Sequence, residues 1–257
     1  MKIFKIIENL LFPKSIKCII CNREIFTDDG FCICEKCLPS LPFCSNKICK
    51  ICGRNIKGDG NLCLACKDSK FKYFSCARSV FNYEGSIKNL IHNLKYNNKK
   101  YLSTSLSKLL YNYYTHCDNF KDVDIILPVP LHKKKLKQRG YNQSELLLES
   151  FYQTKLVNLN VIERIIDTPS QTTKNFKERM ENLENVFICN NKNLIKNKVV
   201  LVIDDVFTTG ATCNSIAKTL IKSGAKKVKC LTLANTVLEN KKQQSKLIRK
   251  WNFAKNH

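Results

Sequence analysis

The sequence has no run of about 18 apolar residues, the length that a membrane-spanning helix needs. It also has no small-residue cleavage site after the apolar positions between Ile3 and Leu11. Those positions have helical spacing, are interrupted by Glu8 and Asn9, and are followed by Pro13. They predict an amphipathic N-terminal helix rather than a signal peptide. We therefore expect a cytoplasmic protein without a membrane span.

Acidic residues are scarce. The 257-residue chain has 21 Asp and Glu against 44 Lys and Arg, which gives a formal charge of +23. An excess of this size favours polyanionic partners such as nucleic acid or phosphorylated ligands. The chain is also rich in Lys, Asn and Ile together, as an AT-rich genome would produce at solvated positions. Charge alone therefore leaves both a polyanion-binding protein and a merely solvated basic surface open.

Cysteine is abundant, but its spacing argues against the disulfide framework of a small secreted protein. Eight of the 15 cysteines form four Cys-x-x-Cys pairs near the N-terminus, separated by 12, 11 and 10 residues. This spacing suits metal thiolates in a reducing cytosol. Residues that tolerate positive φ are favoured just after the second cysteine of a metal knuckle, and Asn22 and Gly53 occupy two such places.

Eight thiolates fit two structural Cys₄ zinc ions, and we expect consecutive pairs to share an ion. The first set is then Cys18, Cys21, Cys34 and Cys37, and the second is Cys49, Cys52, Cys63 and Cys66. A crossed arrangement, or substitution by Cys32 or Cys44, is also compatible with the spacing. A redox dithiol or a group of reduced core cysteines is the alternative to metal binding. Because no His or carboxylate marks an open coordination position, we expect no catalytic zinc.

Strand and helix patterns alternate from Phe71 onward. We predict strands over 76–83, 124–129, 198–203 and 227–234, and helices over 87–94, 102–114, 142–152 and 212–222. A basic loop is expected between the second strand and the third helix. The alternation favours an α/β fold with a mostly parallel sheet and crossover helices.

The segment 199–212 reads VVLVIDDVFTTGAT, which combines a buried strand, two carboxylates and a small Thr/Gly loop that enters a helix. Backbone amides and Thr hydroxyls at a helix N-terminus can hold a phosphate. This cradle would consist of Thr208, Thr209, Gly210, Ala211 and Thr212. The adjacent Asp204 and Asp205 can accept hydrogen bonds from vicinal ribose hydroxyls at the carboxyl edge of the sheet. An acidic turn with a Thr cap and no ligand would explain an isolated Asp-Asp or Thr-Thr-Gly, but the full string is far more specific.

This segment resembles the phosphoribosyl pyrophosphate signature of type I phosphoribosyltransferases, and the resemblance supplies the identity of the ligand. Further residues resemble the ComF/ComFC family of competence-associated, phosphoribosyltransferase-like proteins, which carry cysteine pairs at the front. They are Tyr83, Glu84, Gly85, Ile91, Lys95, residues 128–132 and 139–143, Arg164, Thr168, Gln171, Arg179, Asn182, Val186 and Phe187. The resemblance covers about residues 13–234.

The resemblance implies a type I phosphoribosyltransferase-like (Rossmann-like) parallel sheet with a small N-terminal Cys-rich zinc-ribbon domain. We expect an N-terminal helix and double zinc ribbon over 1–70, the phosphoribosyltransferase-like domain over 71–240 and a basic tail over 241–257. In the wider superfamily, the loop that holds pyrophosphate is similar to Pro128, Val129, Pro130 and Leu131, and the family pattern adds Arg139 beside it. Residues 164–179 resemble the mobile loop that closes over the ligand.

The resemblance also implies a catalytic role for Asp204 and Asp205, which would fix the ribose of phosphoribosyl pyrophosphate with Mg²⁺ bound around it. One expected function is therefore a phosphoribosyltransferase of undetermined acceptor, acting in DNA uptake during natural transformation. The alternative is a non-enzymatic competence protein whose zinc ribbons and basic loops bind single-stranded DNA and other DNA-uptake proteins. A plain zinc-ribbon scaffold would leave the segment 199–212 without a purpose.

Overall fold

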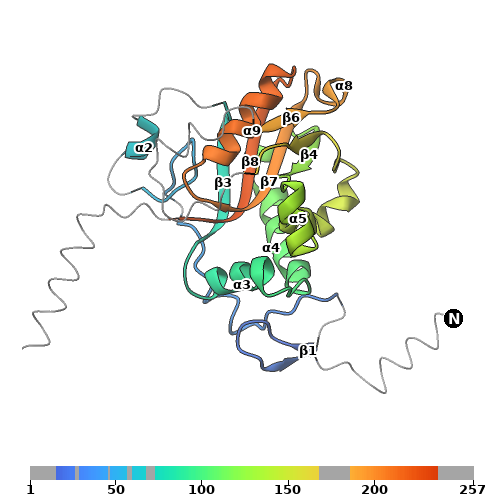
Figure 1. The fold of residues 1–257 in the computed structure, drawn as a ribbon. Helices are drawn as coiled ribbons and strands as arrows, with labels where there is room; N and C mark the ends of the chain where they lie inside the picture. The colour runs from blue at the N-terminus through green and yellow to red at the C-terminus, as the bar shows by residue number, and fades with distance from the viewer. Residues whose placement is uncertain are drawn as a thin grey trace, which may run out of the picture.

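The computed structural model describes residues 16–26, 29–45, 47–56, 60–67, 73–167 and 186–236. Its central element is a four-stranded sheet in the order β3-β8-β7-β4 (Figure 1). The strands are β3 (Cys76–Asn82), β4 (Ile125–Pro128), β7 (Val199–Phe207) and β8 (Lys227–Asn235). All three strand pairs are parallel. This confirms the α/β fold that the alternating patterns predicted.

Helices and short turns precede or connect these strands. They are α2 (Leu64–Lys67), α3 (Gly85–Tyr96), α4 (Leu102–His116), α5 (Lys133–Arg139), α6 (Gln143–Leu146), α8 (Lys192–Ile195), α9 (Ala211–Lys222), and the 3₁₀ turns η1 (Asp118–Phe120) and η2 (Glu149–Thr154). Two antiparallel ladders complete the fold, formed by β1 (Ile16–Lys17) with β2 (Glu24–Ile25) and by β5 (Ile162–Arg164) with β6 (Phe187–Cys189). Within the described ranges, no helix has the length and apolar character that a bilayer crossing requires.

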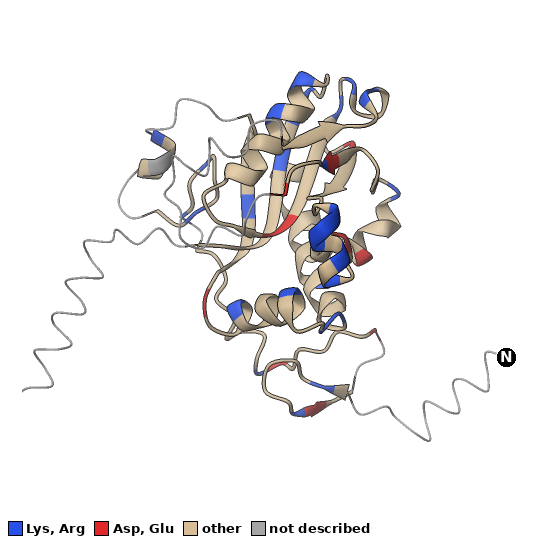
Figure 2. Ribbon diagram, viewed as in Figure 1, with Lys and Arg blue, Asp and Glu red and all other residues tan. Residues whose placement is uncertain are grey.

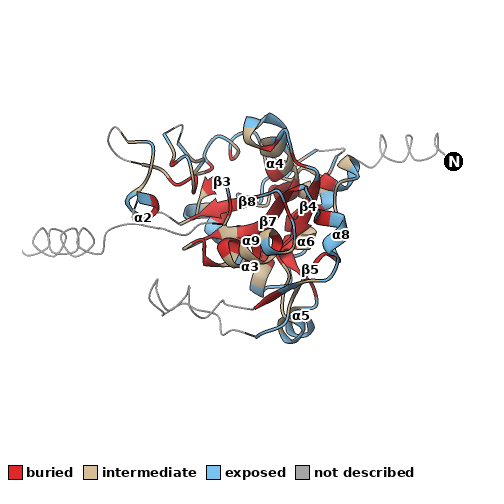
Figure 3. Cartoon of the chain, turned by 90° about the horizontal axis from the view of Figure 1, so that it is seen from above, coloured by how far each residue is buried: buried red, intermediate tan, exposed pale blue. Residues whose placement is uncertain are grey.

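Both faces of the sheet are covered, which explains the continuous apolar run of β7. Val199, Leu201 and Ile203 join one buried cluster with residues of α3 and α4. Val200 and Val202 join a second cluster with residues of α9. Successive strand side chains point to opposite faces, so the two clusters lie on the two sides of the sheet. Figure 3 shows α4 and α9 on opposite sides of the red, buried strands.

The cysteine-rich segments are packed into these clusters rather than standing apart from them. Cys18 and Cys37 belong to the cluster of α3 and α4. Cys49, Cys52 and Cys66 belong to the cluster of α9. Each cysteine-rich segment therefore supports a different face of the sheet.

Three sequence predictions about elements were wrong. The expected basic loop after β4 is the helix α5, because the His132 ring caps its first turn and Gly140, at φ 78°, ends it. The helix expected over 142–152 is broken into α6 and η2. The strand predicted to end at residue 203 continues through β7 to Phe207, so Asp204 lies inside the strand. The predicted N-terminal helix and basic tail lie outside the described residues.

Candidate metal centres and nucleotide site

Eight cysteine sulfurs gather into two groups of four, and each group unites two consecutive Cys-x-x-Cys pairs. The groups are Cys18, Cys21, Cys34 and Cys37, and Cys49, Cys52, Cys63 and Cys66, with the sulfurs of each within 4.8 Å of one another. The Sγ atoms of Cys21 and Cys34 are 3.8 Å apart, and those of Cys52 and Cys63 are 3.5 Å apart. Tetrahedral zinc with bonds of about 2.3 Å requires a sulfur separation of roughly 3.8 Å. The donor sets therefore fit two structural zinc ions.

The backbone turns around the thiolates also have the form that metal knuckles need. The amide of Asn22 donates to the carbonyl of Cys18, and the amide of Gly53 donates to the carbonyl of Cys49, both at 2.9 Å. Asn22 has a φ of 60° and Gly53 a φ of 70°, as predicted for residues just after the second cysteine. The amide of Cys34 lies 3.4 Å from the sulfur of Cys18.

The two cysteines considered as substitutes lie outside both groups. Cys32 donates to the carbonyl of Gly30 at 3.3 Å. Cys44 lies 3.4 Å from the side-chain amide of Asn235. All 15 cysteines are free of disulfides.

At the predicted phosphoribosyl site, Asp204 and Asp205 are almost completely buried, with 9% and 3% of their surfaces exposed. Oδ1 of Asp204 accepts hydrogen bonds from the Ser144 hydroxyl and from the amide of Asp205, both at 2.9 Å. Oδ1 of Asp205 accepts from the amide of Val206 at 2.9 Å. Buried carboxylates are costly unless such donors and nearby cations compensate them.

Three cations provide that compensation. Nζ of Lys95, from the last turn of α3, lies 2.5 Å from Oδ2 of Asp205. Burial raises the pKa of the Asp204 carboxyl, while Lys95, the Ser144 hydroxyl, Arg164 and Arg139 act in the opposite direction. Burial lowers the pKa of Lys95 to about 8, although Asp204 favours its charged form. The site therefore holds two buried carboxylates whose charge is favoured by Lys95, Arg139 and Arg164.

The segment of Pro128, Val129, Pro130 and Leu131 lies directly beside this pair of carboxylates. Pro128 is paired with Ile203, and the amide of Val129 donates to the carbonyl of Ile203 at 2.9 Å. The Asn142 side chain donates to the carbonyl of Val129 at 3.0 Å and accepts from the amide of Ser144. Asn142 therefore links the predicted pyrophosphate segment to the serine that holds Asp204.

Arg139 ends α5, in a surface rich in Lys (Figure 2). Its guanidinium donates to the side-chain oxygen of Gln143 and lies 5.5 Å from the centre of the Tyr96 ring. Arg164 ends β5, and burial lowers the pKa of its guanidinium, while Asp167 and Asp204 act in the opposite direction. Both arginines favour the ionised form of the Asp204 carboxyl.

The predicted phosphate cradle forms the entry to α9. Gly210 is the N-cap of this helix and has a φ of 83°. Thr208 is exposed, Thr209 and Thr212 are half-buried, and Ala211 is the first helical residue. The amide of Ala211 donates to the Thr209 hydroxyl at 3.3 Å. The positive end of the α9 macrodipole favours an anion at this entry.

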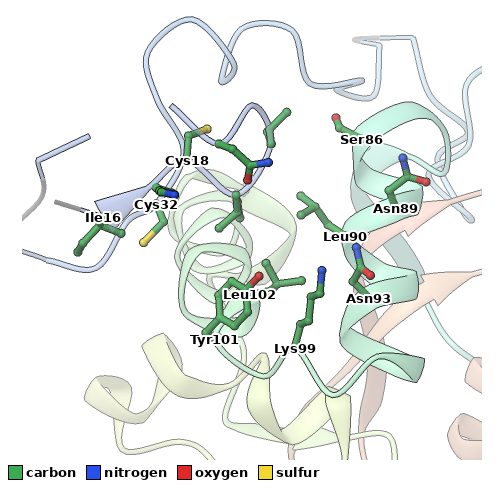
Figure 4. Close-up of a pocket in the computed structure, with 14 residues that line it drawn as sticks. Ile16, Cys18, Cys32, Ser86, Asn89, Leu90, Asn93, Lys99, Tyr101 and Leu102 are labelled. Atoms are coloured by element: carbon green, nitrogen blue, oxygen red, sulfur yellow. The ribbon is translucent and has the colours of Figure 1, made fainter. Parts of the chain in front are cut away.

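A separate hollow of about 550 Å³ lies between the first cysteine group and α3. Figure 4 shows Asn89 and Asn93 of α3 across this hollow from Cys18 and Cys32. It shares no lining residue with the surroundings of Asp204 and Asp205. This hollow is therefore a feature of the cysteine-rich end and not of the predicted phosphoribosyl site.

Sequence reasoning did not assign a role to Lys95 or Ser144, although both contact the carboxylates. The family pattern includes Lys95, but its place four residues after Ile91 does not indicate that its side chain reaches Asp205. Ser144 carried no signal, since only the packing of α6 on β7 brings it to Asp204. Thr168, Gln171, Arg179 and Asn182, in the predicted mobile loop and just after it, lie outside the described residues.

Two family models match the chain. The phosphoribosyl transferase domain matches residues 145–254, and the double zinc ribbon domain matches residues 7–67. The similarity to the structure of hypoxanthine phosphoribosyl transferase from Trypanosoma cruzi covers 52% of this chain and 64% of that chain, at 10% sequence identity and a TM-score of 0.33. The fold assignment rests on the family model and the parallel sheet rather than on this distant likeness.

Several relatives whose names refer to competence or DNA utilization match this chain over nearly their whole lengths. Competence protein F of Haemophilus influenzae is 30% identical over 230 residues, covering 86% of this chain and 97% of that protein. DNA utilization protein YhgH of Escherichia coli is 27% identical, with 80% and 97% covered. Competence protein ComFC of Streptococcus pneumoniae is 26% identical, with 85% and 99% covered. Because it is 30% identical to competence protein F over most of its length and carries both a double zinc ribbon and a phosphoribosyl transferase domain, this chain belongs to the ComF family of competence proteins.

Proposed function

We propose that the protein binds phosphoribosyl pyrophosphate with Mg²⁺ at the carboxyl edge of its sheet and acts in DNA uptake. The observation that carries this proposal is the pair of buried carboxylates, Asp204 and Asp205, placed one short loop before the N-terminus of α9. A carboxylate pair can hold a ribose diol while a helix N-terminus holds a phosphate. The names of the relatives support the role in DNA uptake.

The phosphate end of the ligand would lie on residues 208–212. Gly210 adopts a left-handed conformation that lets the chain turn into α9. The first amides of this helix and the Thr208 and Thr209 hydroxyls can then donate to the 5′-phosphate. The macrodipole of a 12-residue helix adds to the attraction for a dianion.

The pyrophosphate end would lie beside Val129 and Pro130, facing Lys95, Arg139 and Arg164. These cations can neutralise phosphate oxygens in a site where burial strengthens electrostatic interactions. Bound Mg²⁺ would take oxygens of the ligand and neutralise part of the charge on the leaving pyrophosphate. Asp204 and Asp205 would hold the ribose on which these groups are carried.

If the ligand reacts, the bond between ribose C1 and a pyrophosphate oxygen breaks, and its electron pair leaves with the pyrophosphate. A nucleophilic atom of the acceptor forms the new bond to C1 and loses its proton. Because the transition state is cationic at the sugar, positioning and charge stabilisation would provide most of the rate enhancement.

A cytoplasmic location agrees with 15 cysteines free of disulfides.

Calorimetry with phosphoribosyl pyrophosphate and Mg²⁺ tests this proposal. We expect binding by the zinc-loaded protein and a loss of about a hundredfold or more in Asp204→Asn combined with Asp205→Asn, because both diol acceptors lose their charge. Asp118→Asn serves as the control, since the Asp118 side chain is 86% exposed and pairs only with Lys121 among the ion pairs of the described residues. An unchanged isotherm in the double variant would exclude this site.

A second candidate, single-stranded DNA binding, is favoured by a basic hollow of about 610 Å³ next to the carboxylates. Its charged and aromatic lining consists of Lys95, Tyr96, Lys100, Lys135, Lys137, Arg139 and Tyr141. Nζ of Lys100 lies 4.8 Å from the centre of the Tyr141 ring. Cations can track a phosphate backbone, and exposed rings such as Tyr96 can stack on bases.

Single-stranded DNA affinity measured against salt concentration tests the second candidate. We expect the logarithm of the affinity to fall linearly with the logarithm of the salt concentration. Lys137→Gln should reduce the slope by about one unit, because it removes one phosphate contact. Tyr96→Ala should weaken binding without changing the slope, because stacking releases no counterions. A flat salt dependence would contradict backbone binding in this hollow.

A further inference from the structure

Arg54, in the second cysteine-rich segment, is a buried cation that forms no ion pair with a carboxylate of the described residues. Only 4% of its surface is exposed. Its Nε and Nη2 atoms are buried and have no hydrogen-bond partner in the described part of the chain. Its guanidinium carbon lies 5.2 Å from the centre of the Phe207 ring. The Phe207 ring thus contacts this charge, in the geometry of a cation–π interaction in a desolvated setting.

Phe207 is the last residue of β7 and the residue immediately before the predicted phosphate cradle. A Cβ atom built on Gly210 would lie 2.6 Å from Cζ of Phe207, so the cradle rests directly on this ring. The Phe74 ring packs edge-on against Phe207, with ring centres 6.0 Å apart. The position of the Phe207 ring therefore fixes where the backbone of Gly210 can lie.

The turn that holds the second cysteine group also fixes Arg54. The carbonyl of Arg54 accepts from the amide of Cys49 at 2.7 Å, and the carbonyl of Ile51 accepts from the amide of Ala77 in β3 at 2.7 Å. A Cβ at Gly53 would lie 2.5 Å from the Ala77 carbonyl oxygen, so the turn is pressed against the sheet. A metal ion on these thiolates would hold this turn, and with it Arg54, in place.

The first cysteine group provides a natural comparison, because it repeats the same turn. Arg23 follows Cys21 at the same spacing as Arg54 follows Cys52, and its carbonyl accepts from the amide of Cys18 at 2.8 Å. Arg23 is nevertheless exposed. The burial of Arg54 against Phe207 is therefore not a requirement of the metal knuckle itself.

We propose that Arg54 is a positioning residue for the phosphate cradle and that it couples the second Cys₄ site to binding of the phosphoribosyl ligand. This proposal rests on the proposed function, since it concerns the same cradle. When the second site loses its metal, the turn loosens, Arg54 leaves Phe207 and the backbone of residues 208–212 loses its support. The first Cys₄ site packs on the other face of the sheet and has no such contact with the cradle among the described residues.

Replacing Arg54 by methionine tests the positioning role. Arg54→Met keeps an unbranched side chain on Phe207 and removes no hydrogen bond of Nε or Nη2. We expect the midpoint of unfolding to stay or rise, because a buried unpaired charge is removed, while affinity for phosphoribosyl pyrophosphate falls about tenfold. Arg54→Lys should restore part of the affinity. Arg23→Met is the matched control and should change neither quantity.

If Arg54→Met loses both stability and affinity, the role of Arg54 is merely structural and the proposal is overturned. The proposal is also overturned if Arg54→Met binds phosphoribosyl pyrophosphate as tightly as the wild type. The coupling to metal is tested by Cys63→Ser, with loss of one zinc checked first. Cys63→Ser should weaken binding of phosphoribosyl pyrophosphate as much as Arg54→Met does. Its effect should exceed that of Cys21→Ser, which removes a ligand from the first Cys₄ site. Equal weakening by the two cysteine variants would contradict the coupling.

Hydrogen exchange keeps this test separate from the proposed function. In the full-length, ligand-free protein, amides of residues 208–212 should exchange faster in Arg54→Met than in wild type or Arg23→Met. If wild type fails to bind phosphoribosyl pyrophosphate, the proposed function fails, yet the faster exchange would still support the contact between Arg54 and the cradle. Unchanged exchange in Arg54→Met would refute the positioning role even if the ligand binds.

Discussion

The ammonium group of Lys95 lies 2.5 Å from a carboxylate oxygen of Asp205, joining the end of α3 to the central strand β7. Burial lowers the pKa of Lys95 to about 8 from an ordinary value of 10.5, with Asp204 opposing and Arg139 reinforcing the shift. Below pH 8 the folded protein holds this cation at a cost, because it is largely removed from water. We therefore attribute this ion pair to the electrostatics of the carboxylate site and not to a gain in the free energy of unfolding.

The first prediction concerns this residue and pH. Between about pH 8 and 10.5 the unfolded chain binds more protons at Lys95 than the folded protein does, so this residue makes the free energy of unfolding rise with pH. The rise is at most about 1.4 kcal/mol per pH unit. We expect Lys95→Met to remove it, as measured by denaturant unfolding at pH 7.5 and 9.5. Identical pH dependence in both proteins would show that Lys95 titrates normally.

The second prediction concerns the support of Asp204. The Ser144 hydroxyl donates to Oδ1 of Asp204 at 2.9 Å in a fully buried position. Ser144→Ala should lower the free energy of unfolding by about 2–3 kcal/mol, because a buried charged acceptor loses a donor. Ser103→Ala is the control, since the Ser103 hydroxyl donates to the neutral carbonyl of Lys100 at 2.7 Å. Its cost should be about half as large, and equal costs would contradict an ionised Asp204.

The third prediction concerns metal content. Because the sulfurs form two groups of four, the purified protein should contain two zinc ions per chain. Cys21→Ser and Cys63→Ser should each contain one, as measured by elemental analysis and thiol titration. Cys32→Ser should keep two, because Cys32 bonds to Gly30 outside both groups. Loss of both ions from either single variant would show that the two centres depend on each other.

The sequence predicted those features that depend on local pattern. The four parallel strands followed from apolar runs, and the knuckle turns followed from Asn22 and Gly53. The helix α5 was missed because its Lys-rich stretch lacks an apolar face, and His132 and Gly140 define it through capping alone. The broken helix after Asn142 was missed because α6 turns away to pack on β7.

The parts of the site that were missed come from tertiary packing. Ser144 reaches Asp204 across 60 residues of sequence, and Lys95 reaches Asp205 across 205 − 95 = 110 residues. Arg54 and Arg23 each stand two residues after the second cysteine of a Cys-x-x-Cys pair, yet only Arg54 is buried. Local patterns cannot distinguish such positions, because the difference is made by which part of the sheet each turn meets.

The last prediction compares two glycines with the same backbone conformation. Gly210 has a φ of 83° and Gly140 a φ of 78°, so an alanine is strained at both, at about 1 kcal/mol. A Cβ at Gly210 would lie 2.6 Å from Cζ of Phe207, whereas a Cβ at Gly140 would meet nothing within 4 Å. Gly210→Ala should therefore cost roughly 2–4 kcal/mol in unfolding experiments and abolish binding of phosphoribosyl pyrophosphate. Gly140→Ala should cost only the backbone strain. Combining Gly210→Ala with Phe207→Leu should recover part of the lost stability, because a smaller side chain leaves room for the new methyl group. If the double variant is no more stable than Gly210→Ala alone, the ring is not what confines the cradle.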